Sequence, residues 1–270
     1  MPAPRFIAVT NAPSPLLEHC ELTHVARTPI DYAVAVRQHQ GYQAMLRACG
    51  AEVHALDVNR QHPDSVFIED TAIVLDEIAI LTSMGTASRR AEPDGIELAL
   101  RHYRPIERIS LPATIEGGDV TRVGRTLLVG ESSRTNVAGA AALAALVASH
   151  GYRVVTVPVT GCLHLKSACT ALPDGRLLVN PEWIDMRALA SFETITVPAG
   201  ESSAADVAAV GDIVCMSAEH PRTVSLIESL GFTVRTTALS EFAKAEGAVT
   251  CLSLIFTMPA RGPVAGTGIP

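Results

Sequence analysis

The sequence of 270 residues predicts an α/β fold of about five ββαβ modules around a pseudo-symmetric axis, with the helices outside. Four segments share one pattern, which is a polar lead-in, a short strand, a tight turn and a second, apolar strand. These segments are residues 69–83, 118–132, 167–182 and 205–219. Their turns begin at Asp76, Gly124, Asp174 and Gly211, and such regular spacing is typical of repeat and propeller-like folds. A doubly wound parallel sheet is the alternative, but repeated hairpins argue against it.

Helices are predicted between these segments. The first covers residues 28–49, with Thr28 as N-cap and Gly50 just past the end, and another begins after Thr135 and stops at Gly151. The remaining candidates are Gly95–Tyr103, Pro181–Ala190, Pro221–Leu230 and Leu239–Ala245. Short strands such as residues 153–159 and 194–199 follow the helices, which completes the ββαβ order.

The two ends of the chain are expected to complete the fifth module. Residues 5–11 (RFIAVTN) and the stretch GAVTCLSLIF, residues 247–256, both read as strands, and their pairing would close the ring. This interpretation places Cys251 in the last strand. We expect one domain over residues 1–260 and a disordered, Gly/Pro-rich tail over residues 261–270.

Composition and charge exclude several classes of protein. Hydrophobic residues make up 48% of the chain and charged residues 18%, which indicates a globular protein. The net charge of −7 argues against binding to nucleic acid or to an anionic membrane. The six cysteines form no CxxC pair and no zinc-site spacing, and the first residues lack a signal peptide. We therefore expect a reduced, cytoplasmic protein with free thiols and without a metal or other cofactor.

The lead-in segments carry the candidate functional residues, because the starts of the inner strands converge near the axis of such a ring. These residues are Asp64, Glu69, Asp70, Glu116, Asp119, His164 and Cys251. Several carboxylates together favour a cationic ligand, and a guanidinium suits two of them because its donors are planar and bidentate. Arg134 directly precedes a helix start, where its charge opposes the macrodipole, which hints at a bound carboxylate.

Taken singly, each motif also fits an ordinary structural role. Cys251 can fill a core, Asp70 can cap a hairpin, and the glycines after Glu116 can supply positive φ angles. His164 between two leucines fits a satisfied structural histidine, and Arg89 with Arg90 fits a solvated turn.

The motifs are far more specific together and in order. They read PDSVFIED, ASRR, IEGGDV, GESSRTN, CLHLKS and GAVTCLSL. This combination resembles the dimethylarginine dimethylaminohydrolase family of the guanidino-modifying (pentein) superfamily, and the resemblance runs from about Phe6 to Phe256. It implies a five-bladed α/β-propeller and a cysteine hydrolase that converts Nω-methylated arginines to citrulline through a covalent S-alkylthiouronium intermediate.

The resemblance also implies roles at the guanidinium end of a substrate. Cys251 would be the nucleophile and His164 the general acid and base, with Glu116 hydrogen-bonded to His164 or to the substrate. Asp70 would bind the guanidinium, and Glu69 would contribute to the same pocket. The carboxylates should raise the pKa of the thiol, so we expect Cys251 to rest as a thiol until the cationic substrate binds.

Further roles concern the amino-acid end of the substrate. Arg89 and Arg134 would hold the α-carboxylate, and Asp64 the α-amino group. Leu22 would be the hydrophobic residue of a lid that closes over the substrate.

Relatives in the superfamily suggest alternatives. Arginine deiminases, agmatine deiminases and amidinotransferases carry His-x-Asp, whereas Lys166 takes the aspartate position here. The loss of that second carboxylate suits a methylated nitrogen with fewer N–H donors, and two carboxylate-binding arginines favour an amino acid over agmatine. A deiminase-like hydrolase of free arginine and an amidinotransferase are left open, and the retention of His164 and Cys251 disfavours a non-catalytic binder.

Two positions depart from the sequences that this chain resembles. Ser83-Met84 stands where related sequences have Arg-Pro, and Asp206 stands where they have asparagine. The choice among asymmetric dimethylarginine, monomethylarginine and another Nω-substituted arginine is therefore left open, as is a homodimer.

Overall fold

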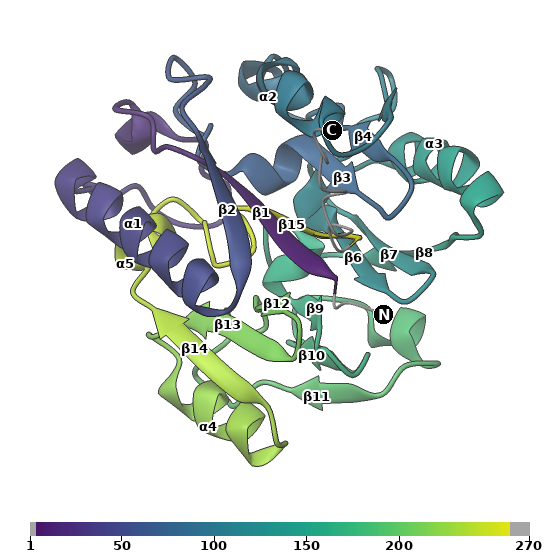
Figure 1. The fold of residues 1–270 in the computed structure, drawn as a ribbon. Helices are drawn as coiled ribbons and strands as arrows, with labels where there is room; N and C mark the ends of the chain where they lie inside the picture. The colour runs from purple at the N-terminus through teal and green to yellow at the C-terminus, as the bar shows by residue number, and fades with distance from the viewer. Residues whose placement is uncertain (1–3, 260–270) are drawn as a thin grey trace, which may run out of the picture.

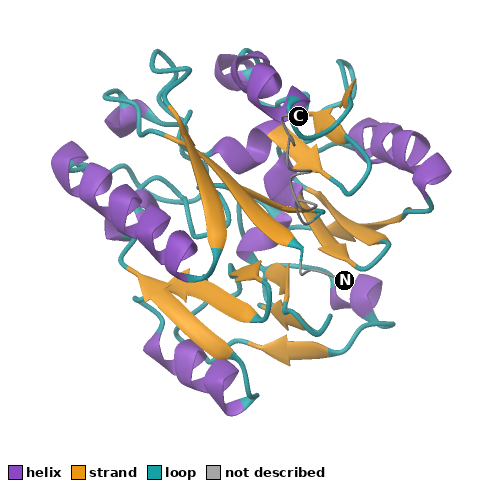
Figure 2. Ribbon diagram, viewed as in Figure 1, coloured by secondary structure: helices purple, strands orange, loops and turns teal. Residues whose placement is uncertain are grey.

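The structure is a computed structural model that describes residues 4–259, so the predicted tail at 261–270 lies outside the described residues. Five three-stranded sheets surround a common centre, and the α-helices lie at the periphery (Figure 1) (Figure 2). The first sheet contains β15 (Leu254–Met258), β1 (Arg5–Asn11) and β2 (Ala51–Leu56), and the second contains β3 (Ala72–Val74), β4 (Ala79–Leu81) and β5 (Ile106–Arg108). The third contains β6 (Val120–Val123), β7 (Thr126–Glu131) and β8 (Arg153–Pro158), and the fourth β9 (Cys169–Ala171), β10 (Leu177–Val179) and β11 (Thr194–Thr196). The fifth contains β12 (Ala208–Val210), β13 (Ile213–Ser217) and β14 (Thr233–Thr237).

Each sheet has the same connectivity, as the repeated pattern predicts. The first strand pairs antiparallel with the second, and the second pairs parallel with the third, as in β6–β7–β8. The hairpin turns depend on glycine where φ is positive, for example 58° at Gly124 and 60° at Gly211. The predicted ββαβ order is therefore confirmed for every module except the fourth, where no α-helix lies between β10 and β11.

The helices agree with the predictions in part. They are α1 (Tyr32–Ala48), α2 (Glu92–Arg101), α3 (Val137–Val147), α4 (Pro221–Ser229) and α5 (Ser240–Ala243). The predicted caps Thr28 and Thr135 are wrong, because Asp31 accepts the Val34 N–H (3.0 Å) and Asn136 accepts the Gly139 N–H (2.8 Å).

The predicted helix Pro181–Ala190 is also wrong. Only the 3-10 helix η7 (Met186–Leu189) forms there. Ile184 makes an antiparallel β-bridge with Val159, which holds the middle of the segment extended and leaves too few residues for an α-helix.

The two chain ends pair as predicted, but Cys251 is not in the strand. β1 and β15 are antiparallel from Arg5↔Met258 to Val9↔Leu254. Before β15 the chain turns, and the Ser253 N–H donates back to the Thr250 carbonyl (3.3 Å). Cys251 therefore lies in a turn at the entrance to the strand.

The apolar core consists of five clusters, each between two successive sheets. One cluster joins the first sheet to the second through Ile7 and Leu81, and corresponding clusters join the second to the third, the third to the fourth and the fourth to the fifth. A further cluster joins Cys215 of the fifth sheet to Tyr42 and Leu46 of α1, beside the first sheet. The packing is thus cyclic.

All six cysteines are free, as expected. Among the described residues, no helix is both long enough and apolar enough to cross a membrane.

Candidate active site

Short 3-10 helices at the starts of the inner strands bring the predicted site residues together. They are η2 (Ile68–Thr71), η4 (Gly117–Asp119) and η6 (Leu165–Ser167), and they directly precede β3, β6 and β9. The glycines of the IEGGDV motif allow this convergence. A Cβ on Gly118 would lie 2.7 Å from Asp70 Oδ1 and 2.8 Å from His164 Cγ, so close approach rather than positive φ requires glycine there.

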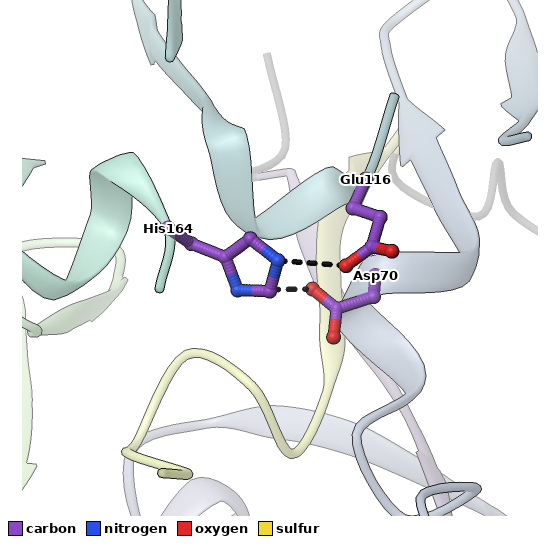
Figure 3. Close-up of side chains that lie close together, drawn as sticks. All are labelled: Asp70, Glu116 and His164. Carbon is purple, nitrogen blue, oxygen red and sulfur yellow. Dashed lines mark hydrogen bonds and ion pairs between the residues drawn. The ribbon is translucent and has the colours of Figure 1, made fainter. Parts of the chain in front are cut away.

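The imidazole of His164 points toward two carboxylates, those of Glu116 and Asp70, as Figure 3 shows. Its Nε2 lies 2.7 Å from Glu116 Oε2, and its Nδ1 lies 3.7 Å from Asp70 Oδ1. Burial alone would lower the pKa of the imidazole, but Asp70 and Glu116 raise it to about 9. The ring is therefore an imidazolium at neutral pH and can donate a proton.

Asp119 supports His164 from the other side. It accepts the Leu165 N–H (2.8 Å) and the Ser132 hydroxyl (2.6 Å), which fixes the turn that carries the imidazole. The sequence identified Asp119 as a lead-in residue but not this positioning role.

Cys251 is half-buried, and the Ala248 N–H points at its Sγ (3.4 Å). Burial and the charges of Asp206, Glu69 and Asp70 raise the pKa of this thiol well above its usual value. The side chain therefore rests as a thiol, in agreement with the sequence-based expectation.

Glu69 forms an ion pair with Lys166 (2.5 Å). Its other oxygen, Oε2, is buried and accepts no hydrogen bond from the described residues. A cavity of about 400 Å³ lies along the inner strands and is lined by Glu69 and Lys166, but not by Cys251 or His164.

Arg89 is buried and almost fully engaged within the protein. Its Nη1 donates to Asp70 Oδ2 (2.8 Å), while Nε and Nη2 donate to Glu92 (3.1 and 2.9 Å). Nη2 also donates to the Phe67 carbonyl (3.2 Å). Glu92, which the sequence analysis did not identify, follows Arg89 by three residues, a spacing that predicts side-chain contact near a helix start.

Arg134 differs from Arg89, because one of its nitrogens has no acceptor. Nη2 donates to Thr23 Oγ1 (3.3 Å) and Nη1 lies 3.8 Å from Glu116 Oε1, beyond hydrogen-bond distance. Nη1 is buried and makes no hydrogen bond to the described residues. An anionic oxygen placed beside it would gain a charge-assisted hydrogen bond.

The loop that contains Leu22 is held by two carboxylates, those of Asp64 and Glu246. Both Asp64 oxygens accept the Glu21 N–H (3.1 and 3.2 Å), and burial raises the pKa of Asp64 to about 6. Glu246, with φ of 58°, accepts the N–H groups of Thr23 (2.9 Å), His24 and Val25 (2.8 Å). Leu22 is partly buried against the neighbouring core cluster. The sequence analysis did not identify Glu246, because only the fold brings it to the loop.

The site as a whole carries more negative than positive groups. Its buried carboxylates are Asp64, Glu69, Asp70, Glu92, Glu116, Asp119 and Asp206. Its cationic groups are Arg89, Arg134, His164 and Lys166. Seven acids against four bases favour a cationic ligand. The same excess could attract a metal ion, since ligand-type atoms of Asp70, Glu116 and His164 lie within 4.8 Å of one another, but the imidazolium form of His164 offers no lone pair.

The two positions that depart from related sequences, Ser83-Met84 and Asp206, have different surroundings. Met84 is fully buried and Ser83 makes a β-bridge with Ile115, so both belong to the scaffold beside Glu116. Asp206 instead accepts hydrogen bonds from Thr250, the residue before Cys251.

Comparisons with known proteins identify the family of this chain. The family model described as N,N dimethylarginine dimethylhydrolase, eukaryotic, matches residues 26–187. The N(G),N(G)-dimethylarginine dimethylaminohydrolase of Streptomyces coelicolor is 40% identical over 248 residues, which cover 92% of this chain and 95% of that protein. Its counterpart in Pseudomonas aeruginosa is 36% identical over 253 residues, which cover 93% and 98%.

Solved structures give the same result. A cysteine-to-serine variant of the Pseudomonas aeruginosa enzyme, in complex with citrulline, matches with a TM-score of 0.86 at 35% identity and covers 93% of this chain and 100% of that one. The N-terminal domain of ArgZ, a cyanobacterial arginine dihydrolase, shares the fold, with a TM-score of 0.80 at 21% identity over 93% of this chain and 97% of that one. The chain belongs to the dimethylarginine dimethylaminohydrolase family and is a hydrolase that acts on carbon–nitrogen bonds.

Proposed function

We propose that this protein hydrolyses Nω-methylated arginines, namely asymmetric dimethylarginine and monomethylarginine, to citrulline and dimethylamine or methylamine. The observation that carries the proposal is the arrangement of one thiol, Cys251, and one imidazolium, His164, among an excess of buried carboxylates. A guanidinium carbon is a poor electrophile, so its hydrolysis needs a strong nucleophile, stabilisation of the cation and a proton donor.

The guanidinium end of the substrate binds the carboxylates. Asp70 Oδ2 is held by Arg89, so Asp70 Oδ1, which accepts the Gly118 N–H, faces His164 and the substrate. Glu69 offers its unpartnered Oε2 to the same group. Lys166 neutralises Glu69 in part, which suits a substrate nitrogen that has lost N–H donors to methylation.

The amino-acid end binds beneath the loop that contains Leu22. The free Nη1 of Arg134 binds the α-carboxylate, and Asp64 binds the α-amino group. Arg89 supports the carboxylate through its charge, while its hydrogen bonds hold Asp70 and Glu92 in place. Leu22 covers the bound substrate as the hydrophobic residue of the lid.

The first chemical step forms a bond between Cys251 Sγ and the central guanidinium carbon. The bond from that carbon to the methylated nitrogen then breaks, and His164 donates a proton to the leaving amine. A covalent S-alkylthiouronium remains on Cys251. Glu116 stabilises the imidazolium before this transfer through its hydrogen bond to Nε2.

The second step is hydrolysis of the intermediate. The neutral His164 accepts a proton from water, the resulting hydroxide adds to the same carbon, and the C–S bond breaks to release citrulline and Cys251. Because the resting thiol is protonated, the cationic substrate favours the thiolate when it binds among the carboxylates, and the thiol proton is released to water before Sγ attacks.

The expected fold, cofactor use, location and assembly of the protein are consistent with this function. We propose that the five modules close into a five-bladed α/β-propeller, and the cyclic packing of the core supports this. The chemistry uses no cofactor or metal, and the free cysteines support a reducing, cytoplasmic location. A single domain over residues 1–260 and a homodimer are retained as proposals.

Product analysis tests the proposed function. The protein is incubated with the two methylated arginines, arginine and agmatine, and citrulline and released amines are measured by mass spectrometry, with Cys251→Ser as the control. Methylated arginines should yield citrulline and the control should yield none. Turnover of plain arginine alone would establish a deiminase, ornithine and an amidinated acceptor would establish an amidinotransferase, and full activity in Cys251→Ser would exclude the mechanism.

A further inference from the structure

Thr250, which directly precedes Cys251, is held by the carboxylate of Asp206. Asp206 Oδ1 accepts the Thr250 backbone N–H (2.9 Å), and Asp206 Oδ2 accepts the Thr250 hydroxyl (3.0 Å). Both contacts are buried. One side chain thus fixes the backbone and the side chain of the residue next to Cys251.

Asp206 is itself held firmly by its neighbours in the chain. The Thr170 hydroxyl donates to the Ala205 carbonyl (2.6 Å) and accepts the Val207 N–H (3.3 Å). Thr170 lies in β9, so the segment on either side of Asp206 is tied to the next sheet. The carboxylate therefore has little freedom to move away from the turn.

The other contacts of this turn involve backbone groups and hydroxyls. The Glu69 N–H donates to the Cys251 carbonyl (3.2 Å), and Ser253 shares a hydrogen bond with the Tyr42 hydroxyl (2.5 Å). Asp206 supplies two of the hydrogen bonds that hold the turn from Thr250 to Ser253.

Asp206 also contributes negative charge beside the thiol. It forms no ion pair with a cationic residue in the described part of the chain, whereas Glu69 has Lys166 and Asp70 has Arg89. The charged groups that act on Cys251 are Asp206, Glu69 and Asp70, and those that act on Asp206 include Glu69 and Lys166. Burial and Glu69 raise the pKa of Asp206 to about 7, so it is fully ionised in the alkaline range in which the thiol titrates.

We propose that Asp206 is a positioning residue that holds the Thr250–Cys251 turn and keeps Cys251 in its thiol form until a cation binds. The last clause rests on the proposed function, in which the cation is the guanidinium of the substrate. An uncompensated carboxylate beside the sulfur opposes the thiolate, and a bound guanidinium offsets that charge. Asp206 thereby makes attack depend on an occupied site.

Asp206→Asn separates the charge from the contact. The amide oxygen of asparagine can still accept the Thr250 N–H, and its NH₂ can donate to the Thr250 hydroxyl, so the turn is retained. Thr250→Val is the complementary variant, because it removes the hydroxyl contact and keeps the charge. Glu201→Gln is the matched control, since Glu201 holds the N–H and hydroxyl of Thr223 in the same way and is not among the groups that act on Cys251.

The measurement is the rate at which iodoacetamide alkylates Cys251, followed by peptide mass spectrometry from pH 7 to 11 without substrate. At pH values below the pKa of the thiol, Cys251 in Asp206→Asn should be alkylated about tenfold faster than in the wild type. A pKa lower by one unit gives a tenfold larger fraction of thiolate. In Thr250→Val and Glu201→Gln, the Cys251 thiol should titrate at the same pH as in the wild type. An unchanged pH profile in Asp206→Asn, or a shift of the same size in Glu201→Gln, would overturn the proposal.

A second readout detects a purely structural role. Thermal unfolding should show that Asp206→Asn keeps the wild-type Tm within a few degrees, and its kcat/KM profile for methylated arginine should shift to lower pH. A lower Tm of Asp206→Asn together with an unchanged alkylation profile would mean that Asp206 only stabilises the fold, which would refute the proposal. If the wild type hydrolyses no methylated arginine, the proposed function fails, while the alkylation experiment still decides the effect of Asp206 on Cys251.

Discussion

The two ends of the site are built in different ways. At the guanidinium end, Asp70, Glu116 and His164 come from short helices that directly precede inner strands, and they contact one another. At the amino-acid end, Asp64 and Arg134 instead contact the loop that contains Leu22. We therefore propose that the scaffold organises the chemistry, whereas recognition of the amino-acid part of the substrate depends on a surface loop. Variants at the first end should change kcat, and variants at the second should change KM.

The largest effect is expected from His164→Gly, at the guanidinium end. Without the imidazole, the amine leaves without a proton and water is not activated, so kcat should fall on the order of 10³-fold or more. Because water is not activated, a covalent intermediate on Cys251 should persist in His164→Gly, visible as added protein mass. Normal turnover in the variant would contradict the acid–base role.

Arg89 and Arg134 give the next test, since the sequence predicts one role for both. Arg89 binds two buried carboxylates, so Arg89→Met leaves Asp70 and Glu92 unpaired and should destabilise the protein by about 3–5 kcal/mol. Nη1 of Arg134 makes no hydrogen bond and only a long ion pair with Glu116 (3.8 Å), so Arg134→Met should raise KM for methylated arginine roughly 10- to 100-fold and destabilise the protein less than Arg89→Met does.

Chemical denaturation and steady-state kinetics of both variants distinguish the two arginines. Arg134→Lys is the control, because it restores a charge but not the planar donor geometry, and should recover part of the lost affinity. Equal losses of stability in Arg89→Met and Arg134→Met would remove the distinction between the two ends.

The local pattern predicted the modules well, because hairpin turns and apolar strands are encoded in neighbouring residues. Cys251 shows where this fails. The strand pattern around it is continuous, yet the Ser253–Thr250 hydrogen bond turns the chain before β15. Glu246 and Asp206 could not be assigned for a related reason, since their partners Thr23 and Thr250 are far away in sequence. The order of the motifs was enough to predict the site residues, whereas the contacts between these residues are seen only in the fold.

The smallest effect concerns pH and the pair His164–Glu116. The folded-state pKa of His164, about 9, lies above the ordinary value of 6.5, so protonated His164 stabilises the folded state. This stabilisation is fully present below about pH 6.5 and is lost as pH rises through 9. The wild type should therefore lose on the order of 1–3 kcal/mol of unfolding free energy over this range. Glu116→Gln keeps an acceptor for the Gly85 N–H but removes a charge that raises the His164 pKa. Urea denaturation from pH 6 to 9.5 should show a shallower loss in this variant, and an equal slope would mean that Glu116 does not hold the proton on His164.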